Sequence, residues 1–332
     1  ITGANTAHLA SSLVLGQDTS ALSQIRAYGA DDSTAGTLEF RMTSSAGAVN
    51  QGVFKLDANS RISLTNNDSG GTGGSDGLSA NTILGYLAGE DIASGGVDNT
   101  YFGHKAGSNN ATGDDNTFVG SNAGKGSHGN SNTNNVGIGS NALLAVSTGS
   151  YNTVVGTYAG DAITTSSNCT LIGRAAGSGI NSTSANGTVC VGNDAGESIT
   201  SGERNTAVGY KSLGSNLIGD KNTAIGYQAL TSFVADTDAH GNNTALGHNA
   251  MQGNVTGTDN TAIGNSSAFS GTNNMTSGDN NTFIGSLSTP SSATPTNQIV
   301  IGYNATGQAD NSVTLGNSSV TNNYLREKIE LK

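Results

Sequence analysis

The residues of this chain that could do chemistry are few and widely separated. The histidines form no H-x-H or H-E-x-x-H pattern, and two cysteines alone do not complete a four-ligand metal set. Glycoside hydrolysis needs two carboxylates about 5–10 Å apart, and no local stretch pairs its acids in this way. We therefore predict no catalytic residue, no bound metal and no cofactor. The residues in question are Cys169, Cys190, His8, His104, His128, His240 and His248.

The thiols and the recurrent aspartates have structural explanations. If neighbouring repeats stack in register, the Cα atoms of Cys169 and Cys190 lie about 8 Å apart, which is beyond the reach of a disulfide. We expect two free thiols that fill apolar positions. Calcium-binding glycine-rich repeats need a nine-residue spacing that this chain lacks, so turn capping is the better interpretation of the aspartates. The aspartates that precede an asparagine are Asp98, Asp115, Asp259 and Asp279.

One repeated phrase determines where the other residues must lie. The stretches "RNTAVGYKSL", "KNTAIGYQAL" and "NNTALGHNAM" begin at Arg204, Lys221 and Asn242, and each contains one central glycine. The phrase recurs most often every 17 residues, and longer spacings add only a few residues. Such a pattern is typical of stacked coils with loop insertions. The central glycines are Gly85, Gly103, Gly120, Gly139, Gly156, Gly173, Gly192, Gly209, Gly226, Gly247, Gly264, Gly285, Gly302 and Gly316.

The positions around each glycine predict a short β-strand. The residue before it is Ile, Val, Leu or Phe, and the residue three before it is Thr in ten of the fourteen copies. Residues two apart share one face of a strand, so we expect both columns to fill the interior of the coil. The Ala or Ser three places after the glycine predicts a second, shorter strand that passes close by. The expected fold is an all-β parallel β-solenoid of about 14 coils over residues 81–320.

The column between those two should point to the opposite face of the strand. It is apolar in almost every copy, and an apolar row along the outside of a rod typically marks an interface. We predict that this column faces two other copies of the chain in a homotrimer. The alternative is a wider coil that buries both faces of the strand itself. The predicted interface residues are Ile83, Tyr101, Phe118, Val154, Leu171, Ala207, Ala224, Ala245, Ala262, Phe283 and Val300.

The position directly after the glycine holds the best candidates for ligand binding. In stacked coils these side chains form a ladder along the rod, and Tyr offers a glycan both an apolar face and a hydroxyl group. The alternative is ordinary packing, because Tyr is a favourable residue at strand edges. The predicted binding residues are Tyr86, His104, Arg174, Tyr210, Tyr227, His248 and Tyr303.

The phrase "NTAIG", with Ala or Ser three residues after its glycine, resembles the head repeats of trimeric autotransporter adhesins. Thr-containing, Gly/Asn-rich versions are similar to segments of bacteriophage tail fibres. The resemblance covers residues 81–320 and implies a left-handed β-roll in which three chains lie side by side. The period differs, because only the step from Gly302 to Gly316 has the 14-residue length of the shorter repeats.

The flanking segments differ from the repeats in composition. Residues 1–66 contain short β-type runs and are predicted to form a small β-rich module, and residues 67–80 read as a Gly/Ser-rich linker. Residues 321–332 include "YLREKIELK", which holds five charges in nine residues. We expect this segment to be a neck or a junction to a following domain.

Charge and hydropathy exclude several function classes. The 332-residue chain has a formal net charge of −11, so it lacks the basic stripe that nucleic-acid binding requires. No apolar run approaches the length of a membrane span. Ice binding by stacked Thr side chains is disfavoured, because the Thr column is expected to point inward.

These features favour a structural and adhesive fibre over an enzyme. The resemblance implies a bacteriophage tail fibre or receptor-binding fibre that attaches to a host surface, located on the virion or outside the cell. The alternative is the head of a bacterial trimeric autotransporter adhesin. The expected partners are two further copies of the chain, neighbouring fibre or virion proteins, and a glycan or protein on the host cell.

Overall fold

A computed structural model describes the strands of the N-terminal region and most of the repeat region. The predicted linker and nearly all of the predicted neck lie outside the described residues, as does most of the N-terminal module. The chain divides into two compact units, residues 1–60 and 61–332, each of which is treated by itself. The described residues are 38–41, 53–56, 62–63, 81–92, 95–181, 185–235, 241–270, 273–322 and 324.

The first unit is described only at two short strands. Strand β1 (Leu38–Arg41) pairs with β2 (Val53–Leu56) in an antiparallel arrangement. The pairing places Phe40 opposite Phe54. The β-type runs that the sequence shows in this region therefore include one antiparallel pair.

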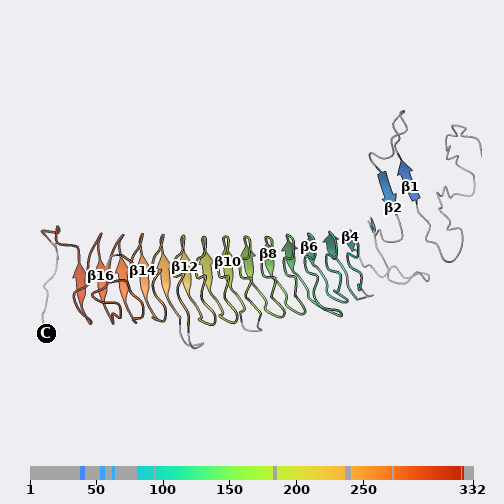
Figure 1. The fold of residues 1–332 in the computed structure, drawn as a ribbon. Helices are drawn as coiled ribbons and strands as arrows, with labels where there is room; N and C mark the ends of the chain where they lie inside the picture. The colour runs from blue at the N-terminus through green and yellow to red at the C-terminus, as the bar shows by residue number, and fades with distance from the viewer. Residues whose placement is uncertain are drawn as a thin grey trace, which may run out of the picture. The chain divides into compact units, whose positions relative to one another are not determined.

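The second unit is a parallel β-solenoid of about 13 coils, and no helix occurs in the described part of the chain. Figure 1 shows its short strands side by side in a single row, with the return segments below them. Strand β3 (Ile62–Ser63) adds one antiparallel partner to β4. The all-β parallel β-solenoid predicted from the repeats is confirmed, with about 13 coils where about 14 were predicted. The parallel strands are β4 (Thr82–Leu84), β5 (Thr100–Phe102), β6 (Thr117–Val119), β7 (Val136–Ile138), β8 (Thr153–Val155), β9 (Thr170–Ile172), β10 (Val189–Val191), β11 (Thr206–Val208), β12 (Thr223–Ile225), β13 (Thr244–Leu246), β14 (Thr261–Ile263), β15 (Thr282–Ile284), β16 (Ile299–Ile301) and β17 (Val313–Leu315).

The strands stack with identical repeat positions side by side. Between β12 and β13, for example, Ala224 pairs with Ala245 and Ile225 pairs with Leu246. The glycine that follows each strand is required for this stacking. Gly226 has a φ of 136°, and a Cβ atom there would overlap the carbonyl oxygen of Gly247 in the next coil. The repeat therefore keeps glycine both for its backbone conformation and for close contact between coils.

The two faces of each strand are the reverse of what we predicted. In β12 the middle residue Ala224 is fully buried, whereas Thr223 and Ile225 are only half-buried. In β5 the aliphatic position is taken by Phe102, whose exposed fraction is 54%. The middle column therefore fills the interior of the coil, and the Thr and aliphatic columns face outward.

The predicted interface residues consequently lie inside their own coil, and their assignment to contacts between chains is wrong. All of them have an exposed fraction of 0–2% in a single chain, so another copy cannot reach them. Alternation showed which residues share a face but did not show which face points inward. The residues concerned are Ile83, Tyr101, Phe118, Val154, Leu171, Ala207, Ala224, Ala245, Ala262, Phe283 and Val300.

The segment after each glycine is a series of tight turns, so the predicted second strand is also wrong. The N–H of Ala229 donates a hydrogen bond to the carbonyl of Gly226 at 3.3 Å, which closes one turn. Gln228 and Leu230 both adopt φ values of 51°, so the backbone reverses repeatedly. The small residue at this position is fully buried, as at Ala229, because the turn folds it into the coil.

The interior of each coil is filled by pairs of residues six positions apart, whose sizes compensate. Where the middle residue is large, as at Tyr101, the partner is Gly107, and a Cβ atom there would overlap the Tyr101 ring. Where the middle residue is Gly137, Ala207 or Ala224, the residue six positions on is a buried Leu. Ala245 is followed six positions later by the buried Met251, and the pair Ala262 and Ala268 is an exception. A close-packed interior of nearly constant width requires this exchange of volume.

A second internal column consists of asparagines four residues before each glycine. The Asn116 backbone N–H and its Nδ2 both donate to Asn99 Oδ1 in the preceding coil, each at 3.0 Å. The same Nδ2 also donates laterally to the carbonyl of Asn132 in the return segment, at 2.8 Å. Each buried amide thus joins two coils and fastens the return segment to the strand. We call this column the Asn ladder; its members are Asn81, Asn99, Asn116, Asn135, Asn152, Asn205, Asn222, Asn243, Asn260 and Asn281.

Candidate functional site

The column of residues directly after the glycine forms two aromatic stacks. The ring centroids of Tyr210 and Tyr227 lie 5.3 Å apart, and those of Tyr227 and His248 lie 5.0 Å apart. The ring planes are inclined by only 19° and 10°. The Nζ atom of Lys211 lies 5.6 Å from the centroid of the Tyr210 ring.

The second stack is a pair, Tyr86 and His104, with centroids 5.6 Å apart and an interplanar angle of 6°. In both stacks each ring covers a face of its neighbour, because the rings repeat along the axis on which the coils stack. Such a stack presents ring edges and hydroxyl groups to solvent rather than ring faces. It is suited to hydrogen bonding and poorly suited to stacking on a sugar.

The other two predicted binding residues differ from the stacked ones. Arg174 donates from Nε to Asn193 Oδ1 at 2.9 Å and from Nη2 to Asp194 Oδ1 at 2.7 Å. Its guanidinium is therefore engaged by the next coil. Tyr303 has an exposed fraction of 65%, and no other ring of the described residues stacks on it. Among the predicted aromatic residues, Tyr303 is the one whose ring has no stacking partner among the described residues, whereas Tyr227 has a ring on both faces.

The two cysteines are free and buried, as predicted. Burial raises the pKa of Cys169 to about 11 and raises that of Cys190 further. Both thiols therefore stay protonated at neutral pH, and a protonated thiol is a poor nucleophile and a poor metal ligand. These residues serve as apolar filling.

Aspartates in the return segments bind backbone groups of neighbouring coils. Asp279 Oδ1 accepts from the Thr258 N–H at 2.8 Å and from the Thr258 hydroxyl at 3.1 Å. Asp98, Asp115 and Asp259 adopt left-handed backbone conformations just before the Asn ladder. Within the described ranges no group of three or more His, Cys, Asp or Glu residues is placed to hold a metal ion.

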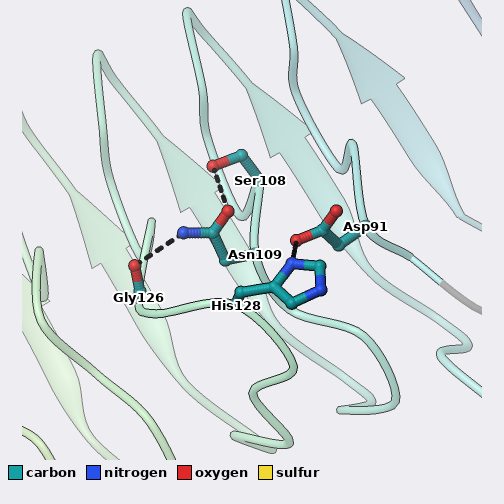
Figure 2. Close-up of polar contacts among 5 residues, drawn as sticks. All are labelled: Asp91, Ser108, Asn109, Gly126 and His128. Atoms are coloured by element: carbon teal, nitrogen blue, oxygen red, sulfur yellow. Dashed lines mark hydrogen bonds and ion pairs between the residues drawn. The ribbon is translucent and has the colours of Figure 1, made fainter.

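One cluster on the return loops of the first coils combines Ser, His and Asp side chains (Figure 2). His128 Nδ1 lies 2.5 Å from Asp91 Oδ2, and the imidazole side chain is 86% exposed. The Ser108 hydroxyl donates to Asn109 Oδ1 at 3.4 Å, and Asn109 Nδ2 donates to the Gly126 carbonyl at 2.8 Å. A hydrolytic triad needs the serine hydroxyl bonded to the imidazole, and here the hydroxyl bonds to an amide instead.

The hydrogen bonds of the Asn ladder were not predicted from the sequence. We predicted no role for this position, although Asn stands there in ten of the fourteen repeats. Its regular recurrence beside a strand was the available signal, since stacked amides can bond along the axis. The size exchange between residues six apart was a second signal that marked the inward face.

The remaining observations concern the whole described chain. Among the described residues there is no helix that is long and apolar enough to cross a membrane. In sequence comparisons the chain matches no protein-family model, and no curated protein matches it either. The case for a function therefore rests on the surface of the solenoid.

Proposed function

We propose that this chain is a structural and adhesive fibre segment, most consistent with a bacteriophage tail fibre, with the head of a bacterial trimeric adhesin as the alternative. The observation that carries the proposal is the uninterrupted parallel register from β4 to β17. At a strand spacing of about 4.8 Å, these coils give a rod about 60 Å long. Repeated coils with one fixed register make a stiff spacer.

The proposal includes a homotrimer in which the outward strand face lies between chains. This face consists of the Thr column and the aliphatic column that precedes the glycine. Large apolar side chains stay exposed along it, and rows of this kind mark interaction surfaces. Its exposed members include Phe102, Ile138, Ile172, Leu246, Ile284, Ile301 and Leu315.

Charge favours further copies of the chain as the occupants of this face. Neither the Thr column nor the aliphatic column contains a charged residue, although the chain as a whole carries a formal charge of −11. Copies that meet through these columns avoid like-charge repulsion at the contact. The left-handed coil that the adhesin resemblance implies also belongs to this proposal.

Measurement of the mass in solution tests the assembly. We expect the 332-residue chain to sediment with three times the mass of one chain, and Ile172→Asp to shift it to a monomer. Val255→Asp is the matched control, because both side chains are 40% exposed but Val255 lies in a return segment. A monomeric parent chain, or equal effects of the two variants, would contradict the trimer on this face.

A second candidate function follows from the outward Thr column. Our reason for disfavouring ice binding was that this column points inward, and the structure shows that it does not. Within the described part of the chain, no Thr hydroxyl of this column forms a hydrogen bond, as at Thr206 and Thr223. Regular rows of hydroxyl and aliphatic groups can order water. A monomer that shows thermal hysteresis would favour this function over the fibre trimer.

A further inference from the structure

The last described coil contains a hollow whose lining consists of uncharged polar residues and one glycine. Its volume is about 510 Å³, which lies within the usual range of small-molecule sites. Every lining side chain is an amide or a hydroxyl, apart from one glycine. The lining residues are Asn304, Thr306, Gln308, Thr314, Gly316, Asn317, Ser318 and Ser319.

One hydroxyl in this wall lacks a partner. Thr314 occupies the inward position of β17, where most other coils place an apolar residue. Its Oγ1 is buried and forms no hydrogen bond. A buried hydroxyl without a partner costs about 1–3 kcal/mol, so a group that bonds to it gains that free energy on binding.

The exposed residue Tyr303 occupies the same repeat position, one coil earlier, as Asn317 of the lining. Tyr303 directly precedes Asn304, and Asn317 Nδ2 donates to the Tyr303 carbonyl at 2.8 Å. The equivalent positions in the coils before and after are Ser286 and Asn317, so no aromatic stack forms here. The Tyr303 ring therefore keeps both faces free of other described rings, unlike Tyr227, which lies between Tyr210 and His248.

We propose that this hollow and the Tyr303 ring form a binding site for a neutral saccharide. A sugar ring presents hydroxyl groups at its edge, which match the amides and hydroxyls of the wall. Its C–H groups form an apolar face that suits an aromatic ring. The absence of cationic residues from the lining selects against anionic sugars, because their carboxylates or sulfates would lose hydration without a charged partner. This site rests on the adhesive function proposed above and names its ligand class.

A polar cap is the competing explanation, since terminal coils of repeat proteins carry a polar outer layer. Among the described strands, β17 pairs only with β16. A cap explains the hydrophilic residues. It does not explain a hydroxyl that is buried and unpartnered, because capping side chains can turn to water.

The test uses the full 332-residue chain and a panel of neutral mono- and disaccharides. Binding is screened by saturation-transfer NMR, and the affinity is then measured by calorimetry. We expect at least one neutral sugar to bind and Tyr303→Ala to weaken it about tenfold through loss of the stacking surface. Tyr227→Ala is the matched control, because the rings of Tyr210 and His248 cover both of its faces, and it should leave the affinity unchanged.

Thr314→Val separates recognition from folding. The substitution keeps the shape of the side chain but removes the unpartnered hydroxyl, so stability towards urea should stay equal or rise. The affinity for the sugar should nevertheless fall about fivefold, the effect of one lost hydrogen bond. A structural role alone would lower stability and affinity together.

Two outcomes overturn the site: no neutral sugar binds, or binding is unaffected by Tyr303→Ala and Thr314→Val. Either result leaves the fibre proposal intact if the chain still sediments as a trimer. Loss of the trimer with retained sugar binding would reject the proposed assembly and keep the site. The sedimentation and sugar-binding measurements thus distinguish the two failures.

Discussion

The coils from β11 to β15 and the coils at β9 and β10 share one backbone register but differ in their internal hydrogen bonds. Along β11–β15 the Asn ladder is continuous; Asn243, for instance, donates from N and Nδ2 to Asn222 Oδ1, both at 3.1 Å. At β9 and β10 the ladder positions are Cys169 and Thr188. Neither the Thr188 nor the Asn205 backbone N–H finds an acceptor among the described residues. We call this pair of coils the ladder gap.

The lateral bonds survive in the gap, and the Cys169 N–H still donates to Asn152 Oδ1 at 3.0 Å, but the axial bonds of Thr188 and Asn205 are missing. The Thr188 hydroxyl donates to the Gly202 carbonyl at 3.2 Å, and Cys169 Sγ donates to the Ala185 carbonyl at 3.3 Å. These contacts replace the bonds that an amide Nδ2 makes elsewhere to the return segment. The comparison teaches that the sheet register does not depend on the ladder, because β9, β10 and β11 stay paired in register. The ladder instead adds stability between coils.

The largest effect is expected from cutting the continuous ladder. Asn222→Ala removes the acceptor for two groups of Asn243 and leaves them buried, so the free energy of unfolding should fall by about 3 kcal/mol. Urea unfolding measures this change. Asn265→Ala is the control; that side chain is exposed, and the loss should stay within about 0.5 kcal/mol. Equal losses for both variants would show that the ladder contributes no stability.

A smaller effect of opposite sign is expected from repairing the gap. Thr188→Asn supplies an acceptor for the Asn205 N–H and keeps a lateral donor for the Gly202 carbonyl. The free energy of unfolding should rise by about 1 kcal/mol, and the Asn205 amide proton should exchange more slowly. Hydrogen exchange followed by NMR checks both. Unchanged exchange at Asn205 would mean that water already satisfies this amide.

The smallest effect is a pH dependence that originates in the gap. Burial raises the pKa of Cys169 to about 11 from its ordinary value of 9.0. Below about pH 9 the thiol is protonated in both the native and the unfolded chain, so its contribution to the free energy of unfolding is fully present. Between about pH 9 and 11 the unfolded chain releases this proton and the native chain keeps it, so stability falls. The alkaline loss should be smaller in Cys169→Asn, and thermal unfolding at pH 8 and pH 10.5 measures the difference.

Burial also raises the pKa values of Cys190 and Tyr101. Their ionisation in the unfolded chain likewise lowers the free energy of unfolding at high pH. Their contributions remain in the Cys169→Asn variant and provide an internal reference. If that variant and the parent chain lose equal stability between the two pH values, the Cys169 thiol does not titrate as proposed.

The sequence predicted the fold correctly but not the orientation of its strands. Fourteen glycines at regular spacing established the parallel coils, since each glycine marks the same turn. The inward face was wrong because the Thr and aliphatic columns were taken as the core pair, and alternation alone does not show which face of a strand points inward. The middle column contains small residues such as Ala207 and Ala224. Leu213 and Leu230, six positions later, fill the space that these alanines leave, and both are fully buried.

The site could be predicted only in part. The ladder of residues after the glycine follows from the repeat, and the Tyr210–Tyr227–His248 stack shows that these side chains align. Which ring keeps a face free depends on the neighbours in the column, and that was readable from the sequence. The polar hollow was not readable, because it depends on how the short final step from Gly302 to Gly316 closes.

The ladder gap also has a mechanical consequence. Backbone sheet bonds and ladder bonds both run along the axis of the solenoid, so coils under tension bear the load in series. A series of links ruptures at its weakest member, and the gap lacks the axial amide bonds that its neighbours have. Force applied along the solenoid between β4 and β16 would therefore concentrate its first opening between Cys169 and Asn205, near the middle of the row of strands, while the coils on either side stay closed.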